Sequence, residues 1–180
     1  MSAHRAVCTL LAQALTLAAC GGGGEAAGSQ TSDAFVAFAG DLSGYRAWPS
    51  FPVDGDAAIA AGVHAAGRRI EYVNRLPPHS ATAFPVGTVV VKEVHADVES
   101  DSRTFAMVKR GGGFNAAGAS GWEWFELQRD TDPVVITWRG VGPPLGEKYG
   151  GDAQGGCNGC HGGARDNDSV LSRALKLGNF

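Results

Sequence analysis

Residues 88 to 96 read TVVVKEVHA, a run rich in valine that predicts a β-strand. On such a strand Lys92 points to the same face as Val90 and Val94, while the intervening residues point to the other face. A lysine in this apolar company is unusual, because burial disfavours the charged ammonium group and lowers its pKa. The alternative is a lysine that reaches solvent from a sheet edge or pairs with an acid.

Further short segments rich in valine, isoleucine and aromatic residues also predict strands: Arg69 to Asn74, Arg103 to Lys109, Trp122 to Gln128 and Val134 to Trp138. Turn clusters separate several of them, and the short spacing of the later ones indicates antiparallel hairpins. Helical patterns are weaker: an alanine-rich stretch covers Ala57 to Ala66, and Asp168 is a candidate cap for a helix through Leu171 and Leu175 towards Lys176. We therefore expect a mainly β (α+β) domain, an antiparallel sheet with a few peripheral helices.

Cys157-Asn158-Gly159-Cys160-His161 is a C-x-x-C-H motif. Two cysteines at this spacing can form thioethers to both haem vinyl groups, and the histidine that follows can bind the iron. The alternatives are a redox dithiol and half of a zinc site. A zinc site needs two more ligands, and the mature chain predicted below has no other cysteine placed to supply them. The motif therefore predicts one haem c, with Cys157 and Cys160 as tethers and His161 as iron ligand.

The N-terminal segment predicts export. Residues 6 to 19 are mostly apolar but too few to cross a bilayer, which is typical of a signal peptide. The run ends in Leu17-Ala18-Ala19-Cys20, which resembles a bacterial lipobox, so we expect cleavage before Cys20 and lipidation of its thiol. An ordinary secretory signal is the alternative. The predicted organisation is a signal peptide at 1–19, a lipidated Cys20 with a Gly/Ala/Ser-rich linker at 20–33, and a haem domain at 34–180.

A glycine tether directly after Cys20 suits a domain held on a membrane, and Gly21 is compatible with export to the outer membrane. Bacteria attach haem c outside the cytoplasm, so both motifs indicate a periplasm-facing lipoprotein. The chain carries 15 basic and 18 acidic residues and no basic patch with interleaved aromatics. Nucleic acid is therefore not an expected partner.

The sequence offers few candidates for a sixth iron ligand. No methionine follows the haem motif, and the mature chain contains only Met107, inside a predicted strand where core or haem packing is its expected role. His64, His79 and His95 are further candidates, and each reads more simply as a surface residue. We therefore expect a five-coordinate iron that is open to a small molecule.

Several segments, taken in order, resemble the cytochrome P460 family, which includes the β-sheet cytochromes c-prime. The segments that carry the resemblance are Tyr45-Arg46-Ala47-Trp48, Arg69 to Asn74, Gly87 to Glu93, Ala106 to Arg110, Trp122 to Phe125 and the terminal Cys157 to His161. The resemblance spans about Asp41 to Leu175.

The resemblance implies a sheet-rich domain, often a homodimer, with haem c against the sheet. It also implies a covalent bond between a lysine, here Lys92, and the porphyrin edge. Catalytic relatives oxidise hydroxylamine and carry a carboxylate a few residues before the first haem cysteine, and Asp152 matches that place. It is an aspartate where glutamate is usual, and Glu147 is the fallback. The implied activity is a hydroxylamine oxidoreductase that passes electrons to a periplasmic acceptor.

Two alternatives remain open. Members of the c-prime type lack the lysine link, bind nitric oxide or carbon monoxide, and carry an apolar wall over the iron. Candidates for such a wall are Phe84, Phe105, Phe114 and Phe125. The other alternative is an electron-transfer cytochrome in which Met107 or a histidine completes the coordination of the iron.

Lys109 lies beside Arg110 and a glycine turn, which predicts a solvated role for its side chain.

Overall fold

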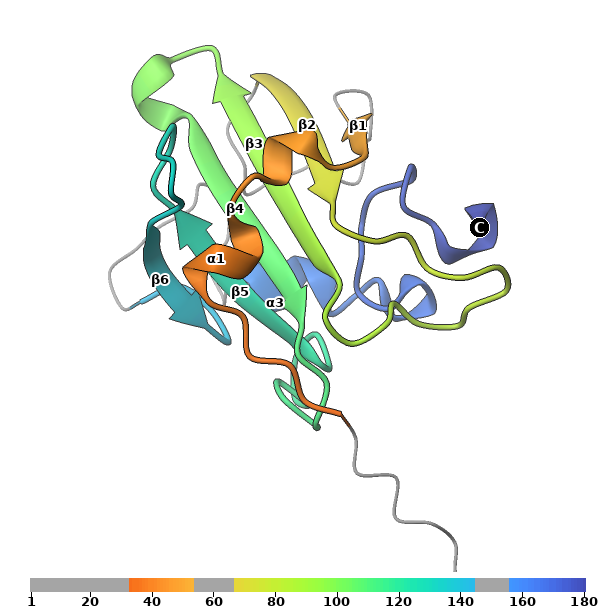
Figure 1. The fold of residues 1–180 in the computed structure, drawn as a ribbon. Coiled ribbons are helices and arrows are strands. Elements are labelled where there is room, and N and C mark those ends of the chain that lie inside the picture. The colour runs from red at the N-terminus through yellow and green to blue at the C-terminus, as the bar shows by residue number, and fades with distance from the viewer. Residues whose placement is uncertain (1–32, 54–66, 145–155) are drawn as a thin grey trace, which may run out of the picture. The chain divides into compact units, whose positions relative to one another are not determined.

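A computed structural model describes residues 33–53, 67–144 and 156–180. The chain divides into two units, Met1–Gln30, which lies outside these residues, and Thr31–Phe180, which carries the fold. Its centre is a six-stranded sheet in the order β1-β2-β3-β4-β5-β6, with every neighbouring pair antiparallel (Figure 1). The strands are β1 (Ser50–Pro52), β2 (Gly67–Val73), β3 (Val89–Ala96), β4 (Arg103–Lys109), β5 (Trp122–Leu127) and β6 (Ile136–Gly140).

The helical elements of these ranges are short. They are α1 (Ala39–Leu42), α3 (Cys157–His161) and the 3-10 turns η1 (Tyr45–Ala47), η2 (Glu99–Asp101), η3 (Arg165–Asn167) and η4 (Leu177–Asn179). Within the described ranges, no helix has the length and apolar character needed to span a membrane. The expectation of a mainly β domain with antiparallel hairpins and a few short helices is confirmed, whereas the predicted helix over Ala57 to Ala66 lies outside the described residues.

Two strand predictions need correction. The last strand begins at Ile136 rather than Val134, because Val134 leaves the sheet and packs into the core while β5 shifts register at Glu126/Leu127. The three-residue β1 was not predicted. Pro49 and Pro52 weaken any strand pattern in this stretch, yet β1 pairs with β2 from Ser50↔Tyr72 to Pro52↔Ile70.

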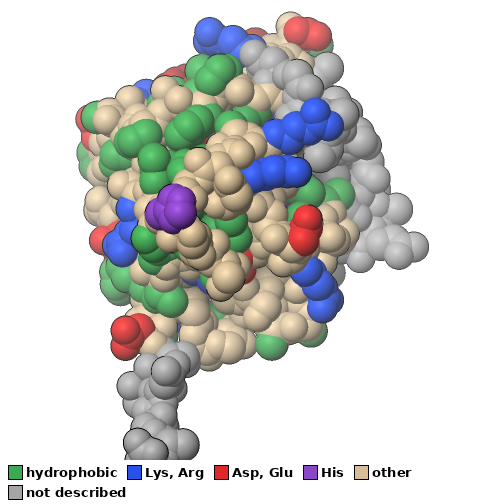
Figure 2. Space-filling view, turned by 90° about the vertical axis from the view of Figure 1, so that its right-hand side faces the viewer, with side chains coloured by type: hydrophobic (Ala, Val, Ile, Leu, Met, Phe, Trp, Pro, Cys, Tyr) green, Lys and Arg blue, Asp and Glu red, His purple; other side chains and the backbone are tan. Residues whose placement is uncertain are grey.

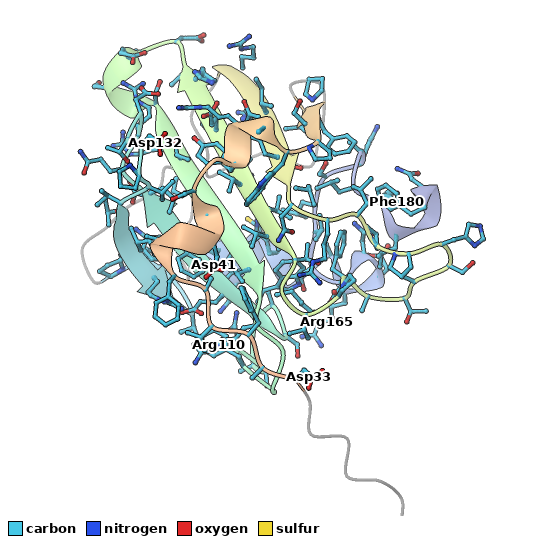
Figure 3. The ribbon with its side chains drawn as sticks, in the orientation of Figure 1. Asp33, Asp41, Arg110, Asp132, Arg165 and Phe180 are labelled. Atoms are coloured by element: carbon cyan, nitrogen blue, oxygen red, sulfur yellow. The ribbon has the colours of Figure 1, made fainter. Side chains whose placement is uncertain are left out.

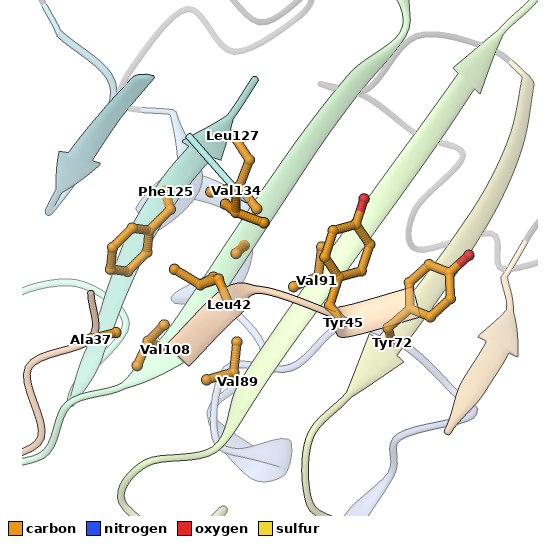
Figure 4. Packing of buried hydrophobic residues seen from close by; sticks show 11 residues of the cluster. Ala37, Leu42, Tyr45, Tyr72, Val89, Val91, Val108, Phe125, Leu127 and Val134 are labelled. Carbon is orange, nitrogen blue, oxygen red and sulfur yellow. The ribbon is translucent and has the colours of Figure 1, made fainter. Parts of the chain in front are cut away.

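The N-terminal segment covers one face of the sheet, which we call the front face. Ala37, Leu42 and Tyr45 pack there on alternate residues of the central strands, including Val89 and Val91 (Figure 4). Alternation along β3 explains why these residues share a face. Figure 3 places Asp41 on this same segment in front of the sheet.

A buried carboxylate ties the N-terminal segment to β3. Glu93 accepts hydrogen bonds from Tyr45 Oη at 2.6 Å and Arg46 Nε at 2.7 Å, with Tyr72 Oη at 3.3 Å and His95 Nε2 at 3.1 Å as further partners. Burial alone would raise the pKa of Glu93, but the bonds from Tyr45 and Arg46 outweigh it and the pKa is lowered. Two segments that carry the family resemblance therefore meet at one ionised group.

The opposite or back face carries α3, which lies behind the sheet in Figure 1, and part of the C-terminal segment, whose end lies to the right of the sheet in that view. Its buried cluster combines Val90, Met107 and Trp124 from three neighbouring strands with Val170 and Leu175 from the C-terminal segment. Cys157 packs against the same cluster. The haem motif is thus held on the face that also bears Lys92.

The predicted helix from Asp168 towards Lys176 is wrong. Asp168 and Ser169 adopt left-handed backbone conformations with φ of 50° and 66°, and the following residues form turns that end in η4. Long-range bonds hold the Asp168 side chain, so it is not available to cap a helix. Figure 3 labels Arg165 and Phe180 on this C-terminal segment.

Candidate functional site

The short helix α3 carries both haem-motif cysteines. Cys157 is partly buried against the back-face cluster, Cys160 is exposed, and both are free thiols. Residues three apart on a helix lie on neighbouring positions of one side, so both sulfurs can meet the edge of a single flat group. This arrangement suits two thioethers to one porphyrin.

The imidazole of His161 is fixed in orientation from two directions. Its Nδ1 lies 2.8 Å from the carbonyl oxygen of Ser169, and its ring centroid lies 4.7 Å from that of Trp124. When Nδ1–H donates to that carbonyl, Nε2 keeps its lone pair for a metal. Although the residue keeps part of its surface exposed, desolvation of the ring lowers the pKa of His161 to about 4, and the positive charge of Lys92 lowers it further. The imidazole is therefore neutral, as iron binding requires.

Asn158, between the two cysteines, fastens α3 to the sheet and to the loop before β5. Its Oδ1 accepts from Trp124 Nε1 at 3.0 Å and from the backbone of Ala119 at 3.2 Å. The side-chain amides of Asn158 and Asn115 also form two reciprocal hydrogen bonds, at 2.8 and 2.9 Å. Asn158 Nδ2 donates a further hydrogen bond to Val141 O at 2.9 Å. Sequence reasoning missed Asn158, because the middle residues of C-x-x-C-H carry no signal of their own.

Replacing Asn158 by alanine is expected to lower the free energy of unfolding by about 2 to 4 kcal/mol. The change leaves several partly buried donors and acceptors without their hydrogen-bond partner at once. Denaturant unfolding measures the change. The matched control is Asn179→Ala, since Asn179 makes only exposed bonds to Arg173 O and Ala174 O. Equal losses in the two variants would contradict the anchoring role of Asn158.

Lys92 lies on the back face and is only 8% exposed. The strand register aligns with Lys92 one residue from each of four other strands, β2, β4, β5 and β6, and these residues point to the same face. The resulting rung runs Glu71, Lys92, Phe105, Glu126 and Trp138. The predicted position of Lys92 beside Val90 and Val94, away from His95, is confirmed. The next rung on this face contains Met107 and Trp124, and the ring of Trp124 contacts His161.

The other candidates divide between the faces. Met107 is buried in the back-face cluster, as a packing role predicts. The prediction that Phe125 contributes to an apolar wall over the iron is wrong, since its ring lies in the front-face cluster. His95 also lies on the front face, where its ring forms a hydrogen bond with Glu93. It therefore lies on the opposite side of the sheet from the haem motif. Asp152, Glu147, His64 and Cys20 lie outside the described residues, so their roles stay predictions.

The prediction of a solvated Lys109 is also wrong. Lys109 is 8% exposed; its Nζ lies 2.6 Å from Asp168 Oδ1, donates to Ser120 O at 3.1 Å and sits 5.1 Å from the centre of the Trp122 ring. Asp168 comes 59 positions later in the chain, so no local pattern could reveal the pair.

The residues present fit a covalently held haem. The motif supplies two free thiols and a neutral imidazole with an oriented Nδ1, next to an apolar cluster large enough to include two tryptophans. Zinc requires more protein ligands than haem, and across 33–53, 67–144 and 156–180 no three His, Cys, Asp or Glu side chains gather into a metal-binding group. Figure 2, which views the side of Figure 1 where the C-terminus lies, shows separate charged side chains among hydrophobic ones rather than one basic patch.

Comparison with known proteins gives no relative. No family model matches the chain, and neither a curated protein nor a solved structure matches it.

Proposed function

We propose that this chain is an exported, lipid-anchored c-type cytochrome of the P460 kind that oxidises hydroxylamine at one open haem site and passes electrons to a periplasmic acceptor. The observation that carries the proposal is the burial of Lys92 on the sheet face that holds the haem motif. Burial disfavours the charged form of a lysine amine, and the neutral amine has the lone pair that a bond to the porphyrin edge requires.

Each residue has a distinct role in this proposal. Cys157 and Cys160 tether the porphyrin, and His161 binds the iron through Nε2 while Ser169 holds Nδ1. Lys92 would be joined to the porphyrin edge through its amine nitrogen, replacing one N–H and one ring C–H with transfer of two electrons to an oxidant during maturation, and would keep the ring rigid. Haem c supplies the redox-active iron at which hydroxylamine loses its electrons. Asp152 accepts a proton from the bound hydroxylamine, which is the step that needs a base near the substrate.

Replacing Asp152 by alanine tests the base. We expect turnover of hydroxylamine with a dye acceptor to fall by roughly 100-fold or more, because general-base catalysis contributes on that scale. Hydroxylamine binding, followed by absorbance titration, should be unchanged. Glu147→Ala is the parallel variant: loss of turnover there with full activity in Asp152→Ala would reject Asp152 and assign the base to Glu147.

A second candidate function is binding of nitric oxide or carbon monoxide without a lysine link. It is favoured by Phe105, which lies directly across from Lys92 on the back face and offers an apolar surface. The two candidates differ in the ferrous absorption spectrum. A Soret band shifted far to the red supports the linked haem of the first, and an ordinary high-spin c-type spectrum supports the second.

A further inference from the structure

The carbonyl that holds His161 belongs to an unusual backbone segment. Asp168 and Ser169 are consecutive non-glycine residues with positive φ. Aspartate tolerates this region better than most residues, whereas for a serine it costs about 1 to 2 kcal/mol, so other contacts must impose the conformation of the pair. In this segment they aim the carbonyl oxygen of Ser169 at His161 Nδ1, 2.8 Å away.

Four tethers impose that conformation. Asp168 binds Lys109 Nζ through Oδ1 at 2.6 Å and the backbone N–H of Phe84 through Oδ2 at 2.9 Å. Its carbonyl accepts from Trp122 Nε1 at 2.6 Å, and the Ser169 N–H donates to Ala164 O at 2.8 Å. The side chains of Lys109 and Asp168 are only 11% and 14% exposed, so solvent screens their attraction weakly. Lys109 itself is fixed at the end of β4.

From these contacts we infer that the Lys109–Asp168 ion pair is a positioning device for the iron ligand. It fixes the backbone whose carbonyl receives the Nδ1–H of His161, and that hydrogen bond sets how strongly the imidazole donates electrons to a metal at Nε2. Lys109 and Asp168 touch neither the iron nor the substrate in this account. The inference rests on the proposed attachment of haem at Cys157 and Cys160.

The test uses the haem-loaded protein and Asp168→Asn as the main variant. Asparagine tolerates left-handed φ as aspartate does, and its side-chain oxygen can still accept from Phe84 N–H. The variant therefore keeps that bond but replaces the charged oxygen that accepts from Lys109 Nζ by an NH2 donor, which breaks the ion pair. Lys109→Met removes the other partner. The matched control is Glu123→Gln, which breaks a buried ion pair with Arg139 on the front face.

The readouts are the iron–histidine stretching frequency in the ferrous protein, by resonance Raman spectroscopy, and the reduction potential. Both Asp168→Asn and Lys109→Met should lower the frequency and raise the potential, because a looser Nδ1 bond makes the imidazole a weaker donor. Glu123→Gln should change neither, although it also loses stability.

Three outcomes would overturn the inference. Unchanged frequency and potential in Asp168→Asn, with haem bound, would mean that the pair is structural only. Equal shifts in Glu123→Gln would mean that general destabilisation causes them. A wild-type protein with no iron–histidine band would remove the proposed function and this inference together, which distinguishes it from the first two results. If Lys109→Met does not fold, Asp168→Asn decides alone.

Discussion

Lys92→Arg protein is expected to retain its haem through Cys157 and Cys160 but to lose hydroxylamine turnover by roughly 100-fold. Arginine is similar in length to lysine and still places N–H donors on the rung beside Glu71. It removes the primary amine that bonds to the porphyrin edge, and groups that orient and tune a metal site contribute about 10- to 100-fold. Turnover per haem, with haem content from the absorption spectrum, measures the change.

Lys176→Arg is the control for this prediction, since Lys176 is exposed on the C-terminal segment. It should keep full turnover and an unchanged spectrum. Normal turnover in Lys92→Arg would show that the amine has no chemical role, and the c-prime type of function would then account better for the buried lysine.

Replacing Glu93 by alanine is expected to lower the free energy of unfolding by about 2 to 4 kcal/mol. The change removes the carboxylate that accepts from the buried hydroxyls of Tyr45 and Tyr72 and from the guanidinium of Arg46. Hydrogen bonds to charged groups contribute about 1.5 to 3 kcal/mol each. Glu99→Gln is the matched control. Glu99 pairs with Arg129 but is 77% exposed in its side chain, and exposed pairs contribute little. Comparable losses in the two variants would contradict the account.

The same residue predicts a pH dependence. The folded-state pKa of Glu93 lies below its ordinary value of 4.5, so its stabilisation is present above that pH and is lost as the pH falls through the folded-state value. Glu93→Gln should therefore lose less stability than wild type between pH 5 and strongly acidic solution. Parallel acid limbs in the two proteins would mean that Glu93 does not carry this effect.

Local patterns predicted five of the six strands and the faces of β3, because alternation along a strand is a short-range property. The position of Lys92 follows from its own neighbours Val90 and Val94, and the register confirms it. The partners of the buried Glu93 carboxylate could not be predicted, since Tyr45 lies 48 positions before Glu93 in the chain. No local pattern links such distant residues.

The C-terminal segment shows why local helix signals can fail. Asp168 has the side chain of a helix cap, but Lys109 and Phe84 from distant strands and loops take both of its carboxylate oxygens. Tertiary contacts therefore outweigh the intrinsic helix preference of the residues that follow. The same contacts bury Lys109, whose glycine-rich neighbourhood suggested solvent.

The most direct test of the account is the mass of the tryptic haem peptide from the denatured, matured protein. We expect one fragment that contains haem, the peptide with Cys157 and Cys160, and a second peptide with Lys92, joined covalently. Haem bound to the cysteine peptide alone would contradict the lysine link, and peptides that carry no haem would contradict the central claim.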